Sequence, residues 1–313
     1  MDTAGNRKLD CEEWPQERAG ELPSKMLEGV MRRFQSSGTD RFLANEESLR
    51  RLVKEPGTRQ VFEQVPSSTL LPFVKRFLVV ESPSRHSDVH LPDTRPVAAF
   101  SFRGRCRLDG DRWAPAAAFT GPREILRAHE HCEGHAVLLA TFTAVGAAAF
   151  LRPPLEEFAG STINLAGVLG RPEELDRLHE QLAGAPHHRR RIKLLENFLG
   201  THIRVSAPDP LMTAAVDWLE RDTEAKRIAE LARYIGLSQS ALERRFRRTL
   251  GISPKRFASI VRLRRAVRLR AGGADLTTIS QAAGYFDQAH FIHDFRRATG
   301  RPPETFFRQV PAE

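Results

Sequence analysis

The 313-residue sequence contains no apolar run near the roughly 20 residues that a membrane-spanning helix needs. Its N-terminus lacks a short apolar segment preceded by basic residues, which a secretory signal would require. Its cysteines, Cys11, Cys106 and Cys132, are odd in number and irregularly spaced, which argues against a disulfide framework. These features predict a protein of the cytoplasm that does not interact with membranes.

Motifs of the common enzyme classes are also missing. The sequence has no Gly-x-Ser-x-Gly motif, no phosphate-binding loop ending in Gly-Lys-Ser/Thr and no His-Glu-x-x-His motif. We therefore expect a protein that is not an enzyme, with no catalytic residues and no cofactor.

Positive charge is plentiful and unevenly placed. The formal net charge is +9, and residues 209–313 hold 19 Lys/Arg against 12 Asp/Glu, whereas residues 1–60 hold 11 of each. A basic excess confined to one region is the electrostatic footprint that a phosphate-binding surface needs. The chain is also long enough for about two domains, each with its own core.

The basic region contains an internal repeat. At one offset of 49 residues, the first copy maps onto the second as Leu242, Phe246, Gly251, Pro254 and Phe257 onto Phe291, Phe295, Gly300, Pro303 and Phe306. Upstream of a turn the offset is 48, so the second copy has gained one residue in that turn. A duplicated unit of helix, glycine-containing turn and arginine-rich helix is the pattern of two helix-turn-helix units.

The second helix of each unit is predicted to bind DNA. In the first unit it covers residues 239–249, with Ser238 as its N-terminal cap and an apolar stripe of Leu242, Phe246 and Leu250. In the second unit Phe291 and Phe295 form the stripe. The polar faces then hold Gln239, Ser240, Glu243, Arg244 and Arg247 in the first unit, and Gln288, His290, Ile292, His293 and Arg296 in the second.

The remaining patterns predict an α+β protein. Residues 1–60 are polar and charge-balanced, which indicates a flexible or loosely docked extension. Residues 61–170 read as a β-rich regulatory domain, in which Phe100 and Phe102 alternate with polar residues, and residues 171–208 read as a helical linker or dimerisation segment. Residues 209–313 are predicted to form an all-α domain of about seven helices, which begins at the prolines Pro208 and Pro210.

The C-terminal motifs resemble a known family. The residues that carry the resemblance are Leu231-Ala232, Gly236-Leu237-Ser238, Leu242, Arg244 and Phe246 in the first unit, and Ala283-Gly284-Tyr285, Asp287-Gln288, Phe291, Phe295-Arg296-Arg297, Gly300 and Pro303 in the second. They look like the DNA-binding domain of AraC/XylS-type transcription regulators. The resemblance implies two helix-turn-helix units joined by the long helix Pro254–Ala271, which enter successive major grooves of one duplex.

The same resemblance assigns roles and partners. Carried over by position, Ser240, Glu243 and Arg244 of the first unit would face base edges, as would Gln288, Ala289, His290 and His293 of the second. The implied partners are double-stranded promoter or operator DNA and RNA polymerase, with room for a small-molecule effector and a homodimer. Residues from about Phe73 to Leu169 are similar to a cupin-like sensor domain, which is paired with this DNA-binding type in many bacterial regulators.

One cluster has metal-ligand side chains, namely His129, His131, Cys132 and His135. A cupin metal site has a His-x-His pair whose glutamate follows after three or four intervening residues, but here Glu133 follows after one. Because Glu133-Gly134 also reads as a turn, we interpret the cluster as a polar hairpin tip and predict no metal.

Three alternative interpretations would make the chain something other than a transcription regulator. The arginine-rich helices could be no more than a solvated surface, although a duplication with matched packing positions argues against that. A binder of the nucleoid type would hold any duplex through charge alone. AraC-type helices also occur fused to DNA-repair alkyltransferases, but those need a Pro-Cys-His-Arg nucleophile motif, and no cysteine of this chain follows a proline.

Overall fold

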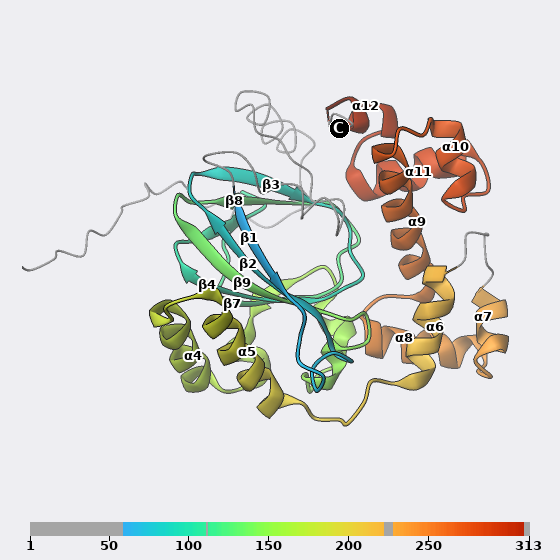
Figure 1. Ribbon diagram of the computed structural model, residues 1–313. Coiled ribbons are helices and arrows are strands. Elements are labelled where there is room, and N and C mark those ends of the chain that lie inside the picture. Colours follow the sequence, from blue (N-terminus) through green and yellow to red (C-terminus); the bar gives the residue numbers. More distant parts are fainter. Residues whose placement is uncertain (1–58, 111, 222–227, 310–313) are drawn as a thin grey trace, which may run out of the picture. The chain divides into compact units, whose positions relative to one another are not determined.

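The computed structural model describes residues 59–110, 112–221 and 228–309 (Figure 1). All the described residues belong to one compact unit. The extension predicted over residues 1–60 therefore lies almost wholly outside the described residues.

Two antiparallel sheets make up the first part of the described chain. The strands are β1 (Gln60–Gln64), β2 (Val74–Ser82), β3 (His86–His90), β4 (Val97–Arg103), β5 (Cys106–Leu108), β6 (Arg112–Trp113), β7 (Ala117–Thr120), β8 (Arg127–His131), β9 (His135–Phe142) and β10 (Thr162–Asn164). One sheet has the order β1-β2-β9-β4-β7-β10, and the other has the order β3-β8-β5-β6. The predicted β-rich region is confirmed.

The alternation of apolar and polar residues produces these strands. Phe100 and Phe102 on β4 are only 1% and 6% exposed, because every second side chain of the strand points into the core. Between β5 and β6, Asp109 and Gly110 both have positive φ, 52° and 78°. Positive φ at both central residues is what a tight hairpin turn of this hand requires.

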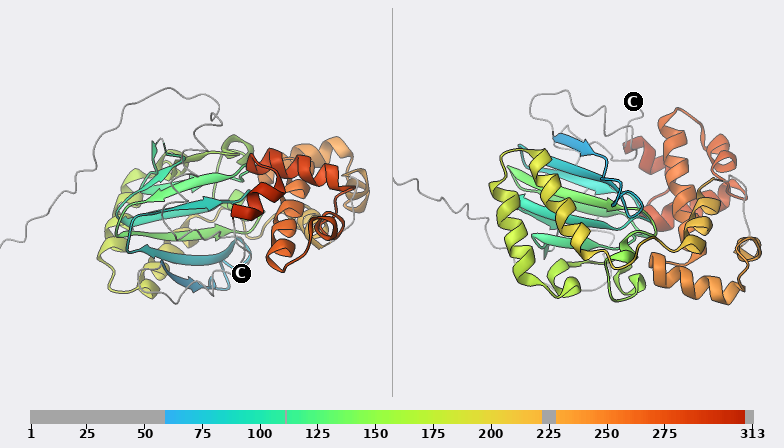
Figure 2. Two further views of the ribbon diagram at one scale, coloured as in Figure 1. Left: turned by 90° about the horizontal axis from the view of Figure 1, so that it is seen from above. Right: turned by 60° about the horizontal axis from the view of Figure 1, so that its bottom comes forward.

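Five helical segments accompany the sheets. They are the 3₁₀ segments η1 (Ala147–Ala149) and η2 (Leu155–Phe158), and the helices α3 (Leu165–Leu169), α4 (Pro172–Gly184) and α5 (His188–His202). In the right view of Figure 2, α4 and α5 lie across a face of the six-stranded sheet. Leu178 of α4 and Leu195 of α5 belong to the same core cluster as Phe77 and Phe100 of the sheet. We call the sheets and these five segments the β-rich domain.

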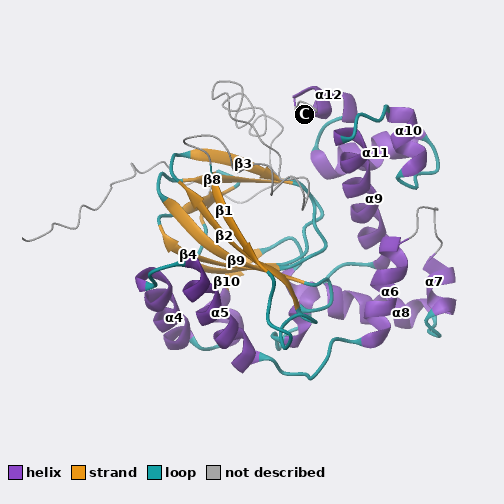
Figure 3. Ribbon diagram, viewed as in Figure 1, coloured by secondary structure: helices purple, strands orange, loops and turns teal. Residues whose placement is uncertain are grey.

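Seven helices follow among the described residues, and we call them the helical domain. They are α6 (Pro210–Arg221), α7 (Ile228–Tyr234), α8 (Gln239–Leu250), α9 (Pro254–Ala271), α10 (Leu276–Ala282), α11 (Gln288–Thr299) and α12 (Pro303–Gln309), drawn in purple in Figure 3. Of the helices that the structure describes, none is both long and apolar enough to span a membrane.

Two apolar clusters hold the helical domain together, and α9 contributes to both. Phe257 near its start belongs to the cluster that also contains Leu231 of α7 and Phe246 of α8. Leu263 in its second half belongs to the cluster that contains Phe291 and Phe295 of α11. The long helix is therefore the common support of the two repeated units.

Asp209 fixes the start of the helical domain. Its Oδ1 accepts hydrogen bonds from the backbone N–H groups of Leu211 and Met212, at 3.1 and 3.3 Å, and so caps α6. Arg245 of α8 donates from Nε and Nη2 to the same carboxylate, at 2.6 and 3.0 Å. One side chain thereby caps one helix and ties a second helix to it.

Candidate nucleic-acid interface

The first helix-turn-helix unit consists of α7, a short turn and α8. Gly236 in the turn has φ 70°, which costs glycine little, and the N–H of Leu237 donates to the carbonyl of Ala232 at 2.9 Å. Ser238 Oγ then accepts from the N–H of Ala241 at 3.2 Å, which confirms the predicted cap of α8.

The second unit, α10 and α11, repeats this construction. Gly284 has φ 83°, and the N–H of Tyr285 donates to the carbonyl of Ser280 at 3.0 Å. Asp287 caps α11 by accepting from the N–H of His290 at 2.7 Å. The additional residue of this copy lies between Gly284 and the cap, in the stretch that contains Phe286, whose side chain is 85% exposed.

The apolar stripes of both second helices are buried as predicted. Leu242, Phe246 and Leu250 of α8 are 0% exposed, and so are Phe291 and Phe295 of α11. Since the opposite side of each helix then faces outward, its polar residues are free to meet a ligand.

The ten residues predicted to contact DNA lie on these outward faces. Glu243 is half-buried, and the nine exposed residues are Gln239, Ser240, Arg244, Arg247, Gln288, Ala289, His290, His293 and Arg296. Arg247 Nη2 lies 2.8 Å from Glu243 Oε1, one turn earlier on α8. Because this ion pair is solvent-exposed, breaking it to reach a phosphate costs little, about 0–1 kcal/mol.

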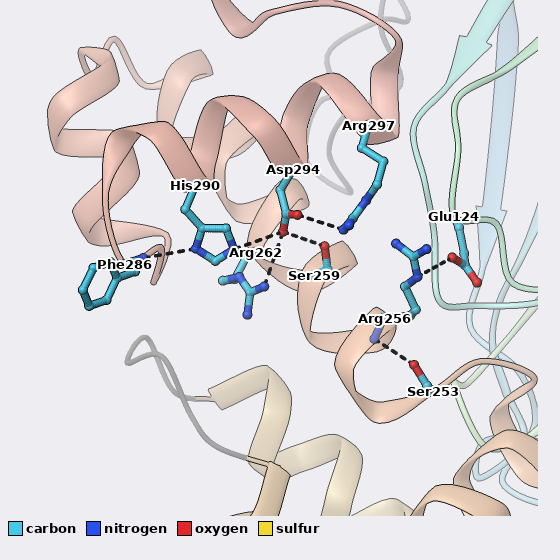
Figure 4. Close-up of polar contacts among 9 residues, drawn as sticks. All are labelled: Glu124, Ser253, Arg256, Ser259, Arg262, Phe286, His290, Asp294 and Arg297. Carbon is cyan, nitrogen blue, oxygen red and sulfur yellow. Dashed lines mark hydrogen bonds and ion pairs between the residues drawn. The ribbon is translucent and has the colours of Figure 1, made fainter.

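A buried carboxylate organises the second unit (Figure 4). Asp294 on α11 has only 7% of its side chain exposed, and it accepts hydrogen bonds from Ser259 Oγ at 3.0 Å and from Arg297 Nη2 at 2.8 Å. Arg262 Nη2 lies 3.5 Å and His290 Nε2 3.7 Å from Asp294 Oδ2. Asp294 therefore links α11 to two side chains of α9 and sets the orientation of α11.

The sequence pattern does not reveal this role of Asp294. Asp294 lies directly before the buried Phe295 and three positions after Phe291, at the edge of the apolar stripe. That position is the only local sign that its side chain points toward the core. Its partners Ser259 and Arg262 come from another helix, more than 30 residues away.

The two predicted histidines of α11 are held differently. The N–H of Phe286 approaches His290 Nδ1 at 3.5 Å, and the ring's Nε2 faces Asp294, so the His290 imidazole is engaged within its own unit (Figure 4). His293 is exposed on the next turn of the helix. Of the two, His293 is the freer to contact a ligand.

Loops of the β-rich domain contact the helical domain near the start of α9. Ser253 caps α9 through the N–H of Arg256, at 3.2 Å, and the Arg256 Nε lies 3.0 Å from Glu124 Oε2 (Figure 4). Gly251, which ends α8 with φ 83°, lies so close to the carbonyl of Leu155 that an added Cβ would come within 2.9 Å of that oxygen.

A second group of contacts reaches the far half of α9 and the end of α11. Arg264 Nη1 lies 2.7 Å from Asp93 Oδ2 and 3.3 Å from the carbonyl oxygen of Pro92, and the N–H of Leu126 donates to the carbonyl of Ala298 at 2.9 Å. Both helix-turn-helix units are thus in contact with the β-rich domain.

Asp93 is the central charge of this contact. Burial raises the pKa of its carboxyl, but the guanidinium groups of Arg264 and Arg123 more than offset the effect, so its pKa lies below the usual range. The N–H of Arg95 donates to Asp93 Oδ1 at 3.0 Å, which also stabilises the ionised form. Asp93 is therefore ionised at neutral pH and holds a positive partner from α9.

Comparison with known proteins agrees with this architecture. A family described as a helix-turn-helix domain matches residues 231–309. A Streptomyces lividans protein, described as an AraC-like transcription regulator, is 34% identical over 97 residues, covering 30% of this chain and 32% of that protein. The HTH-type transcriptional activator RhaS of Pectobacterium carotovorum subsp. carotovorum is 31% identical over 99 residues, covering 31% of this chain and 36% of that protein.

A solved structure gives a third likeness. The transcriptional regulator with an AraC-type DNA-binding domain from Chromobacterium violaceum is 30% identical over 31% of this chain and 88% of that chain, with a TM-score of 0.29. The chain spans about a third of the length of the curated relatives it matches. Its C-terminal region is a helix-turn-helix domain, and that domain is of the AraC type.

Proposed function

We propose that the protein is a sequence-specific, DNA-binding transcription regulator of the AraC type. The observation that carries this proposal is the pair of helix-turn-helix units on one shared helix, each with a buried apolar stripe and an exposed polar face. Helices α8 and α11 would enter successive major grooves on one side of the duplex, about 34 Å apart. The net charge of +7 in residues 209–313 favours approach to phosphate.

The exposed residues of α8 and α11 would contact the DNA bases and phosphates in different ways. Arg244 is the strongest base-reading candidate, since a guanidinium can bind guanine in the major groove through two hydrogen bonds, and it pairs with none of the described carboxylates. Ser240 and Glu243 would contact neighbouring bases, with Arg247 beside them. On α11 Gln288, Ala289, His293 and Arg296 are the contacts, while His290 is tied to Asp294.

The contacts of the β-rich domain with α9 and α11 support control of DNA binding by that domain. A small molecule or a second copy of the chain that moved the loops around Asp93 or Glu124 would act directly on the helix that carries both units. The proposal includes RNA polymerase as a partner and the cytoplasm as the place of action.

Selection of bound sequences from a random duplex pool tests the proposal. With the full chain we expect one enriched site with two short boxes about one helical turn apart. The affinity for that site should fall steeply as salt rises, because each phosphate contact releases counterions. A protein that retains all duplexes equally would be a charge-driven binder of the nucleoid type, and the proposal would be wrong.

Replacing Arg244 with alanine should weaken binding to the selected site by about 1–3 kcal/mol and relax the preference at one base pair. The matched control is Arg248→Ala on the same helix, which we assign to phosphate or solvent and which should weaken all duplexes alike. Competition binding with the selected site and single-base variants measures both effects. Equal weakening of every sequence by Arg244→Ala would make Arg244 a phosphate contact.

A further inference from the structure

Metal-binding side chains gather on one face of the four-stranded sheet. His86 on β3 is paired with His131 on β8, which in turn is paired with Cys106 on β5. Two residues further along these strands, Asp88 on β3 is paired with His129 on β8. Since side chains two residues apart share a face, all five lie on the same side of the sheet.

This cluster is not the polar hairpin tip that the sequence suggests. The turn itself is present at Glu133-Gly134, where Gly134 has φ 70°. The histidines that flank it, however, are buried, with His131 5% and His135 2% exposed. Asp88, which comes from a strand more than 40 residues earlier, is buried beside His131 at 6% exposure. A surface turn does not account for so many buried polar side chains.

Two separations around Asp88 Oδ2 are close to those in a tetrahedral metal site, and the three candidate ligand atoms all lie within 4.8 Å of one another. Asp88 Oδ2 lies 3.3 Å from His131 Nε2 and 3.6 Å from His86 Nε2. Two ligands bound to a tetrahedral ion at about 2.0–2.1 Å lie roughly 3.3–3.4 Å from each other. The two imidazole rings are stacked, 4.7 Å apart and 9° from parallel, which places them side by side against the carboxylate.

The tautomer of His86 leaves a lone pair directed at this point. Its Nδ1 lies 3.1 Å from the carbonyl oxygen of Ser84, and because a carbonyl only accepts, Nδ1 carries the hydrogen. In the neutral ring, Nε2 is then an acceptor facing the acceptor Oδ2 of Asp88. Both atoms are buried, and His86 Nε2 has no hydrogen-bond partner among the described residues, whereas Asp88 Oδ2 lies beside the guanidinium of Arg59. A metal ion between the two atoms would accept the lone pair of His86 Nε2.

His131 is held by a chain of hydrogen bonds. Its Nδ1 lies 2.9 Å from Nδ1 of His135, whose Nε2 lies 3.1 Å from Ser101 Oγ. When His131 Nδ1 and His135 Nε2 carry the hydrogens, each ring is neutral and His131 Nε2 presents a lone pair. Such outer hydrogen bonds orient histidine ligands in metal sites.

Arg59 is the competing cation at this position. Its Nη2 lies 2.7 Å from Asp88 Oδ2 and neutralises the carboxylate. The guanidinium pairs with only one of the three candidate ligand atoms, Asp88 Oδ2. The Nε2 atoms of His86 and His131 remain without a hydrogen bond. A bound ion would contact all three atoms, and the guanidinium would have to move away from Asp88 Oδ2 first.

We propose that His86, Asp88 and His131 bind a divalent transition-metal ion of the zinc class, with a fourth position open to water. Two imidazoles and one carboxylate suit such an ion better than they suit calcium or magnesium, which prefer oxygen ligands. The ligands come from β3 and β8, and no glutamate follows the His-x-His pair at the cupin spacing. Cys106 and His129 also lie near His131 but are not part of the proposed site.

Zinc titration of the full chain, stripped of metal, tests this assignment. Isothermal calorimetry should show one tight ion per chain, and zinc should raise the melting temperature. His86→Ala and Asp88→Asn should each weaken zinc binding by at least about tenfold and abolish the shift in melting temperature. The Asn variant keeps the shape of the carboxylate, so it separates loss of a ligand from loss of packing.

Two control variants make the result decisive. Cys106→Ser in the same sheet and His179→Ala on α4 should leave zinc binding unchanged. The assignment is overturned if the wild type binds no zinc, if His86→Ala and Asp88→Asn bind it normally, or if Cys106→Ser is the variant that loses it. Circular dichroism of each variant without zinc checks that the fold is retained. The inference is independent of the proposed DNA binding.

Discussion

Replacing Phe295 with alanine is expected to lower the free energy of unfolding by about 3–5 kcal/mol, the usual cost of removing a fully buried phenyl ring. Phe295 is 0% exposed, and its ring centroid lies 5.6 Å from that of Phe291 and 5.1 Å from those of Phe306 and Phe307. Its removal leaves a cavity between α11 and α12. Denaturant unfolding, followed by circular dichroism, measures the change.

Ile292 is the matched control on the same helix. It lies three positions before Phe295 and is 36% exposed, so Ile292→Ala should cost much less than Phe295→Ala. The truncation at Phe295 should also weaken DNA binding, because α11 loses the contact that holds it on its partners. An unchanged unfolding midpoint for Phe295→Ala would show that the second unit is not packed around this ring.

Replacing Asp93 with alanine is expected to cost about 3 kcal/mol, at the lower end of the range for breaking a buried ion pair, since Asp93 and Arg264 each keep about a fifth of their side chains exposed. The loss leaves the guanidinium groups of Arg264 and Arg123 without their carboxylate. The control is Glu124→Ala, which breaks the more exposed pair with Arg256 and should cost about 1 kcal/mol or less.

The effect at Asp93 should depend on pH in a defined direction. Because the pKa of Asp93 is lowered in the folded protein, its contribution is present above the pKa of an unfolded aspartate, about 4, and is lost as pH falls towards the folded pKa. The difference in stability between wild type and Asp93→Ala should therefore narrow in acid. A constant difference from pH 7 down to acid would mean that the carboxylate charge contributes nothing.

The features of the helical domain that are local in sequence could be predicted. Helical periodicity identifies Phe246 and Phe295 as anchors, and Gly236 and Gly284 mark the turns, because such signals depend on residues a few positions apart. Ser238 as a cap follows from the same short range. The duplication strengthened each inference, because every feature occurs twice.

Features that depend on distant parts of the chain could not be predicted. The histidine cluster exists because β3 pairs with β8, and no pattern within either strand specifies that partner. The contact of Asp93 with Arg264 joins residues 171 positions apart. Residues 171–208 are predicted to be a helical linker or dimerisation segment, and their apolar stripes do not specify which surface they cover; in the structure α4 and α5 contribute to the core of the six-stranded sheet.

Because α9 belongs to both apolar clusters, its length would fix the spacing of α8 and α11 in the proposed complex with DNA. Each residue added to an α-helix rotates the remainder of the helix by about 100° and advances it by about 1.5 Å. One inserted residue between Phe257 and Leu263 would thus turn α11 away from the side of the duplex that α8 faces. In the proposed complex, the two boxes of the binding site would therefore have to lie in one phase of the DNA helical repeat, and half a turn of additional base pairs between them should place the second box out of reach.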